Sequence, residues 1–161
     1  MNESILCIYY SRTGVTERAA QEIATSLGCE CVEIYDHVDR DGALGWLRCG
    51  LDAVKKRTRP ICEPELEHPL ASYPLVIVCT PVWAGRCSSV VRSFLQRRGG
   101  EVRNVAYVIT HRSERPYREV YEQMDRCAGK TRVAEVSLRP GKTGYEFWRD
   151  QFLKRVADFV S

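Results

Sequence analysis

This sequence has no long apolar runs. None of its apolar stretches approaches the roughly 20 residues that a membrane-spanning helix needs. Its first residues, MNESILCIYYS, include an acidic residue and too short an apolar run for a secretory signal. We therefore expect a cytoplasmic protein with no membrane partner.

The sequence also lacks a C-x-x-C pair, although its 161 residues include eight cysteines. Cys29 and Cys31 share one face of an expected strand without a second pair of ligands, which argues against a metal site. Cys7 and Cys79 lie within apolar runs, where a thiol packs as a small hydrophobe. Cys87 is expected to be a half-buried structural thiol. We expect reduced, mostly buried thiols and no bound metal.

The positive charge is not organised as a nucleic-acid surface. The formal net charge of +3 comes from scattered residues and one cluster, Lys55, Lys56, Arg57 and Arg59. Such a surface usually interleaves aromatic side chains with the basic ones, and this cluster has none. We interpret it as a solvated helix end and expect no nucleic-acid partner.

Short apolar runs alternate with helical patterns along the whole chain. Strands are expected at 5–10, 29–35, 75–80, 104–110 and 133–138. Helices are expected at 15–27, within 42–56, and around 90–98, 117–124 and 145–159. This alternation predicts a single α/β domain over residues 1–161, with a parallel sheet covered by helices on both faces. Trp46 and Trp148 lie on helical stripes and are expected in the core. The proline-rich residues 59–74 are expected to form an extended surface segment.

The stretch SRTGVT, residues 11–16, follows the first expected strand and opens the first expected helix. A helix start offers free N–H groups that attract an anion, and Ser11, Thr13 and Thr16 add three hydroxyls. Polyphosphate loops carry a lysine at this point, and this loop has none. The pattern therefore predicts a site for one terminal phosphate, held without metal. The alternative is an ordinary N-cap, which requires one hydroxyl.

A second loop, TPVWAGR at residues 80–86, follows the third expected strand. In a parallel sheet of order 2-1-3-4-5 the first and third strands are neighbours, and ligands bind where they end. The two loops should therefore lie side by side. We expect Trp83, between Pro81 and Gly85, to be exposed and to offer a flat surface beside the phosphate. This combination favours a phosphorylated aromatic cofactor.

The segments YYSRTGVTERAAQEIA and LVIVCTPVWAGRCSSVVRSFL resemble the flavodoxin-like family, whose members bind flavin mononucleotide (FMN). The resemblance implies a three-layer flavodoxin-like fold with a five-stranded parallel sheet of order 2-1-3-4-5. It implies no catalytic side chain. The positions that it places around FMN are Ser11, Arg12, Thr13, Gly14, Val15 and Thr16 at the phosphate, Pro81, Val82, Trp83, Ala84 and Gly85 along the isoalloxazine ring, and Thr110, His111, Arg112 and Ser113 on its other side.

Three functions compete to explain these features. The first is an FMN-dependent oxidoreductase or electron carrier that takes electrons from a reductant, with NAD(P)H or a redox protein as candidate partners. The second is a module that has lost the cofactor and acts through protein contacts; the loop THRSERP, where the family has glycines, supports it. The third, a cysteine phosphatase, fails because the four residues between Cys7 and Arg12 are one too few. The oligomeric state is left open.

Overall fold

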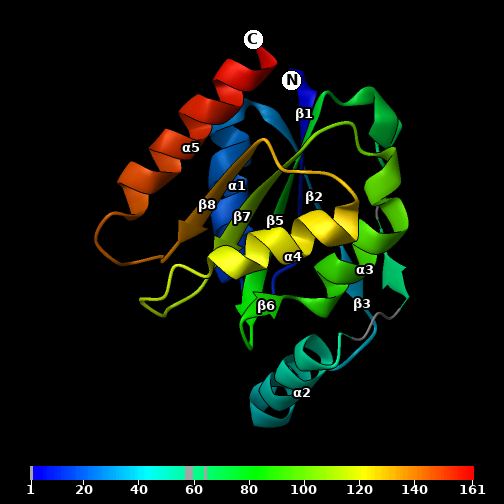
Figure 1. Cartoon of the computed structure of the whole chain (residues 1–161), viewed down its shortest axis with the longest axis vertical. Coiled ribbons are helices and arrows are strands. Elements are labelled where there is room, and N and C mark those ends of the chain that lie inside the picture. Colours follow the sequence, from blue (N-terminus) through cyan, green and yellow to red (C-terminus); the bar gives the residue numbers. More distant parts are fainter. Residues whose placement is uncertain (1, 57–59, 64) are drawn as a thin grey trace.

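The computed structural model describes residues 2–56, 60–63 and 65–161. Its centre is a sheet of parallel strands, and Figure 1 shows them running side by side. The strands are β1 (Asn2–Tyr9), β2 (Cys29–Glu33), β5 (Leu75–Trp83), β7 (Val105–Thr110) and β8 (Ala134–Leu138), in the spatial order β2-β1-β5-β7-β8. This order is the expected 2-1-3-4-5, so the predicted fold class is confirmed.

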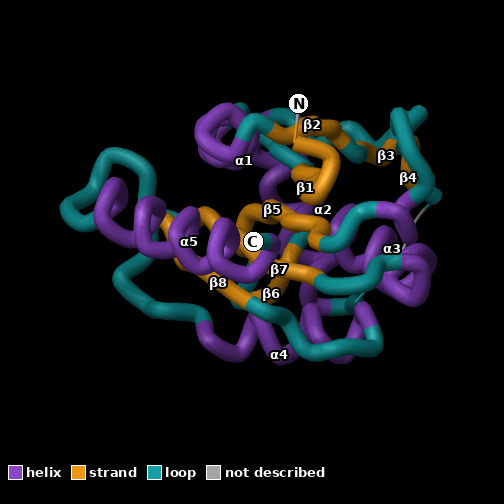
Figure 2. Tube along the Cα trace, turned by 90° about the horizontal axis from the view of Figure 1, so that it is seen from above, coloured by secondary structure: helices purple, strands orange, loops and turns teal. Residues whose placement is uncertain are grey.

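Helices cover both faces of the sheet, which gives three layers (Figure 2). Helices α1 (Val15–Leu27) and α5 (Tyr145–Val160) lie on one side, and α3 (Ser89–Arg98) and α4 (Arg118–Ala128) lie on the other. A short 3-10 helix, Gly99–Glu101, follows α3. The apolar part of β1, residues 5–9, is buried on both faces of the sheet. Ile5 and Cys7 pack in the α1 and α5 layer, whereas Leu6 and Ile8 pack in the α3 layer.

The long connection between β2 and β5 contains its own small elements. A two-stranded antiparallel ribbon pairs β3 (Tyr35–Asp36) with β4 (Ile61–Cys62), and a 3-10 helix spans Leu70–Ser72. Between β3 and β4 along the chain, α2 (Gly42–Val54) extends past the carboxyl edge of the sheet (Figure 1). The helix expected within 42–56 is thus confirmed. Parts of two other predictions, the basic residues Arg57 and Arg59 and the extended chain at 59 and 64, lie outside the described residues.

Two aromatic residues predicted in the core are on the surface. Trp46 is 67% exposed, because α2 turns a different face inward, that of its small residues and Asp52. Trp148 is 54% exposed, because α5 reaches the core through Phe152 and Val156. The ring of Trp148 instead packs edge-on against its neighbour Phe147.

The third expected strand is longer than predicted. Strand β5 continues through Pro81 to Trp83 and then reverses into β6 (Arg86–Cys87), which pairs with it antiparallel. The turn consists of Ala84 and Gly85, with φ angles of 49° and 74°. Two positive φ angles are typical of a tight type I′ hairpin turn. The stretch predicted as a loop is therefore a tight hairpin.

The cysteines are mostly buried, as expected. Cys7 and Cys79 have no exposed surface and lie in the core. Cys87 is also fully buried rather than half-buried, and this burial raises the pKa of its thiol to about 12. In the described part of the chain, no helix is both long and apolar enough to cross a membrane.

Candidate functional site

A cavity of about 700 Å³ opens at the carboxyl edge of the sheet. The loop before α1, the β5–β6 hairpin, the loop after β7 and helix α2 form its walls. Most of the sequence-predicted residues line it, and Ser11, Gly14 and Gly85 are the exceptions. The predicted residues that line it are Arg12, Thr13, Val15, Thr16, Pro81, Val82, Trp83, Ala84, Thr110, His111, Arg112 and Ser113.

The loop before α1 ends in an uncapped helix start. Gly14 is the N-cap residue, with φ 93°, and no side chain caps the helix. The first helical bond runs from the Arg18 N–H to the Gly14 carbonyl, so the N–H groups of the three residues between them have no partner within the helix. A helix of this length with open N–H groups attracts an anion.

The three hydroxyls of this loop have different roles. The Ser11 Oγ accepts a hydrogen bond from the Gly14 N–H at 3.0 Å, which fixes the turn and leaves the hydroxyl proton of Ser11 available. The buried Thr16 Oγ1 pairs with the Thr110 Oγ1 at 2.7 Å, which joins this loop to the end of β7. The Thr13 side chain is exposed and makes no hydrogen bond within the described residues. The sequence alone did not separate these roles.

Arg12 points away from the helix start. Its Nε donates to the Arg40 carbonyl at 2.8 Å, and its Nη2 donates to the Gly42 carbonyl at 3.0 Å. In this arrangement Arg12 fastens the loop to the residues that begin α2.

Trp83 lines the cavity but is only 7% exposed, so the expectation of an exposed ring is wrong. Trp83 is the last residue of β5, and its ring packs into the core. Tyr10 meets it edge-on, with ring centroids 5.5 Å apart, and the Arg40 guanidinium carbon lies 4.8 Å from its centroid. The ring is therefore fixed by its neighbours, with little surface left for a ligand.

The loop after β7 carries less positive charge than its sequence suggests. Burial lowers the pKa of His111, and the charge of Arg139 acts in the same direction. Its ring is held by the Ser137 hydroxyl at Nε2 and by the edge of Tyr117. Arg115 forms an ion pair with Glu119 at 2.8 Å. Arg112 is therefore the cation that this loop presents to the cavity.

Helix α2 provides an apolar wall that the sequence analysis missed. The cavity is lined here by Trp46, Leu47, Leu51 and Val54, all of them at least 45% exposed. Their helical spacing was visible in the sequence, but such spacing does not tell a core-facing stripe from one that faces a ligand. The apolar stripe of this helix faces the cavity.

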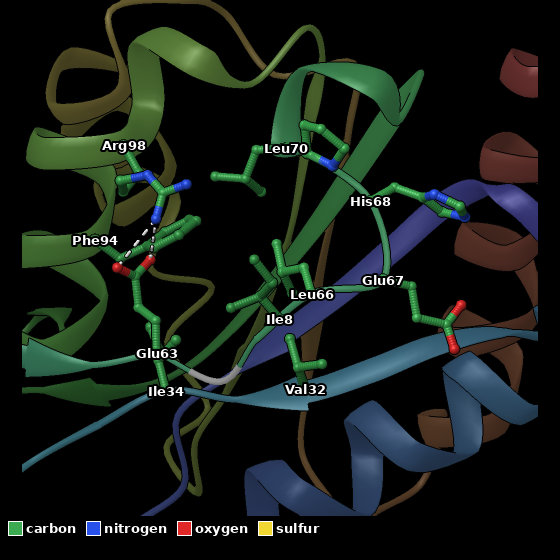
Figure 3. Close-up of a pocket in the computed structure, with 11 residues that line it drawn as sticks. Ile8, Val32, Ile34, Glu63, Leu66, Glu67, His68, Leu70, Phe94 and Arg98 are labelled. Carbon is green, nitrogen blue, oxygen red and sulfur yellow. Dashed lines mark hydrogen bonds and ion pairs between the residues drawn. The ribbon is translucent and has the colours of Figure 1, made fainter.

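A second cavity, of about 370 Å³, lies between the sheet, α3 and the residues around Leu66 (Figure 3). Its interior is apolar, with Ile8 and Phe94 deeply buried. At its rim the Arg98 Nη1 donates to Glu63 at 3.0 Å. None of the sequence-predicted site residues lies there, and the polar groups that Figure 3 joins already satisfy each other. The larger cavity is therefore the candidate functional site.

Three comparisons with known proteins bear on this site. No family model matches the chain, and no curated protein matches it. Several solved structures do match the chain. A flavoprotein from Lactobacillus acidophilus NCFM, crystallised in complex with FMN, is 19% identical with a TM-score of 0.71, over 91% of this chain and 99% of that one. The WrbA-like flavodoxin from Agrobacterium tumefaciens is 14% identical with a TM-score of 0.64, over 99% and 98%.

The two-electron reduced flavodoxin from Megasphaera elsdenii is 16% identical with a TM-score of 0.55, over 97% of each chain. At these identities the likeness concerns the fold. The chain has the flavodoxin-like fold over nearly its whole length.

Proposed function

We propose that this protein binds FMN at the carboxyl edge of its sheet and transfers electrons between a reductant and an acceptor. The observation that carries the proposal is the convergence of three loops and one helix on a single cavity of about 700 Å³. The Lactobacillus acidophilus protein, which has the same fold, was crystallised in complex with FMN.

The residues present fit the two ends of FMN. The uncapped start of α1, with the hydroxyls of Ser11 and Thr13, would hold the phosphate as a helix terminus holds an anion. Pro81, Val82 and the small exposed part of Trp83 on one side, and the loop 110–113 on the other, would border the flavin ring. When bound, FMN would supply the electron-transfer chemistry.

The surroundings of the ring would tune that chemistry. Arg112 would place a positive charge at the cavity. His111 would add little charge, because its lowered pKa favours the neutral form of its ring. A nearby cation favours the anionic, fully reduced state of a flavin. The apolar residues of α2 would exclude water from the ring and contact the reductant or acceptor. NAD(P)H and a redox protein are both candidate partners.

A titration of the apoprotein with FMN and with riboflavin tests the proposal. Charge-assisted hydrogen bonds contribute about 1.5–3 kcal/mol each, so losing two of them should weaken binding roughly a hundredfold or more. We therefore expect FMN to bind at least that much more tightly than riboflavin, measured by quenching of flavin fluorescence.

Equal affinity for the two flavins would contradict the assignment of the α1 loop to the phosphate. No binding of either flavin would favour the alternative, a flavodoxin-fold module without cofactor. A visible absorption spectrum of the freshly purified protein is an independent check of the same point.

A further inference from the structure

Arg40 is a buried arginine that the sequence analysis did not mark. Its side chain bonds to three different elements and is only 4% exposed. The Nη2 donates to Asp36 at 2.7 Å on β3, to Asp52 at 3.0 Å on α2 and to Ser89 at 3.1 Å on α3. Both carboxylates are themselves buried, so the ion pairs cannot be replaced by water.

The same guanidinium lies over the ring of Trp83. Its central carbon is 4.8 Å from the ring centroid, which is within cation–π distance. Tyr10 contacts the same ring edge-on. Trp83 is thus fixed between two side chains, and one of them is tied to α2 and α3 by ion pairs and hydrogen bonds.

The backbone around Arg40 holds two further walls of the cavity. Its carbonyl accepts the hydrogen bond from Arg12, which belongs to the loop before α1. On its other side it contacts Gly45 in α2 so closely that a Cβ there would lie 1.9 Å from the Arg40 carbonyl carbon. Residue 40 therefore touches the loop 11–16, the ring of Trp83 and the start of α2.

We infer that Arg40 is a positioning residue of the flavin site, which sets the relative placement of the loop 11–16, Trp83 and the apolar wall of α2. The inference rests on the proposed function. Arg40 does not itself line the cavity and acts through the residues that do. Only an arginine meets the requirement, because its planar fork binds two carboxylates while its face stacks on an aromatic ring.

The test compares Arg40→Lys with the unaltered chain, both labelled with 5-fluorotryptophan. Fluorine NMR gives one signal for each of the three tryptophans, and Trp83→Phe identifies the signal of Trp83. We expect Arg40→Lys to shift the Trp83 signal, to leave that of the distant, exposed Trp148 in place, and to weaken FMN binding at least tenfold. Arg92→Lys is the matched control, since Arg92 is equally buried but lies on α3 and does not line the cavity. It should change neither the Trp83 signal nor FMN affinity.

An unshifted Trp83 signal, or an FMN affinity within twofold of the unaltered chain, would overturn the inference. If Arg40→Lys does not fold, Asp36→Asn decides the question with the same two readouts, because it removes one carboxylate and retains the arginine. The fluorine signal is read without flavin. A chain that binds no FMN therefore contradicts the proposed function, while the position of Trp83 still reports on Arg40.

Discussion

At the scale of single residues, the hydroxyl of Thr13 is the clearest candidate for a direct contact with the ligand. The Ser11 oxygen and the Thr16 hydroxyl already have partners inside the protein, whereas the Thr13 side chain is exposed at the cavity. A hydroxyl that donates to a phosphate forms a charge-assisted bond, which is stronger than a bond between neutral groups.

Replacing Thr13 by Val should therefore weaken FMN binding about tenfold, given about 1.5 kcal/mol for one such bond. The shape of the side chain is kept, and exposed substitutions change stability by only about 0.5 kcal/mol or less. We expect the urea midpoint to stay where it is while the dissociation constant rises. Thr13→Ser, which keeps the hydroxyl, is the matched control. If the valine variant binds FMN as tightly as the serine variant, the hydroxyl makes no contact with the phosphate.

Side-chain partnerships explain what the sequence could and could not predict about the site. That the loops at 11–16 and 81–85 lie side by side could be predicted, because strand ends in a parallel sheet meet at one edge, whereas the assignment of 110–113 to the site came from the resemblance to the flavodoxin-like family. The Thr16–Thr110 bond and the Arg12–Arg40 contact join residues 94 and 28 positions apart, and no local pattern encodes such pairs. Arg40 itself stands in a polar stretch and looks like a solvated charge until the fold buries it.

At the scale of secondary structure, the β5–β6 hairpin stores conformational strain beside the cavity. Ala84 has φ 49°, a left-handed conformation that costs a residue with a Cβ roughly 1–2 kcal/mol. Glycine adopts the same conformation freely, as Gly85 does at φ 74°. The turn therefore holds one residue suited to its backbone and one that is not.

Ala84→Gly should stabilise the protein by about 0.5–1 kcal/mol, since relief of the strain exceeds the added entropy of the unfolded chain. Gly85→Ala should destabilise it by about 1 kcal/mol or more, because an alanine at this positive φ takes on the left-handed strain that glycine avoids. Urea unfolding of the two variants gives opposite shifts of the midpoint from the unaltered chain. Shifts of the same sign would contradict this account of the turn.

Helix α2 shows what an apolar stripe in the sequence predicts and what it does not. The stripe of Leu44, Leu47 and Leu51 predicts a helix correctly, and α2 is that helix. The prediction that Trp46 on this helix lies in the core was wrong, because α2 turns inward the face that carries the buried Asp52, which pairs with Arg40. Periodicity reports that one face is apolar, and only the tertiary partners decide whether that face meets the core or a ligand.

At the scale of the whole molecule, the alternation of strands and helices predicted the parallel sheet covered on both faces, whereas the order of its strands came from the resemblance to the flavodoxin-like family, because alternation and right-handed crossovers allow more than one order. The sheet divides the core into two layers, and the cysteines lie in both. Cys7 and Cys79 sit at the centre of the sheet in the α1 and α5 layer, with their sulfur atoms 3.8 Å apart. Cys87 lies in the α3 and α4 layer. Cys62 is half-buried on the β3–β4 ribbon, beside the His37 Nε2 at 2.9 Å.

This distribution predicts a wide separation of thiol reactivities in the native protein. A thiol at the centre of the sheet reacts only when the fold opens, and a stability of about 5 kcal/mol reduces that rate several thousandfold. A contact with Cys31 lowers the pKa of the Cys7 thiol, but the neighbouring Cys79 and burial together outweigh it and raise the pKa well above its ordinary value. We therefore expect iodoacetamide in native buffer to modify Cys62 first and to leave Cys7 and Cys79 unmodified, as followed by peptide mass spectrometry.

Urea below the unfolding transition should accelerate modification of Cys7 and Cys79 together. It should leave the rate at Cys62 almost unchanged, because only the modification of Cys7 and Cys79 depends on global opening. Modification of Cys7 as fast as that of Cys62 in native buffer would show that the centre of the sheet opens without unfolding the molecule.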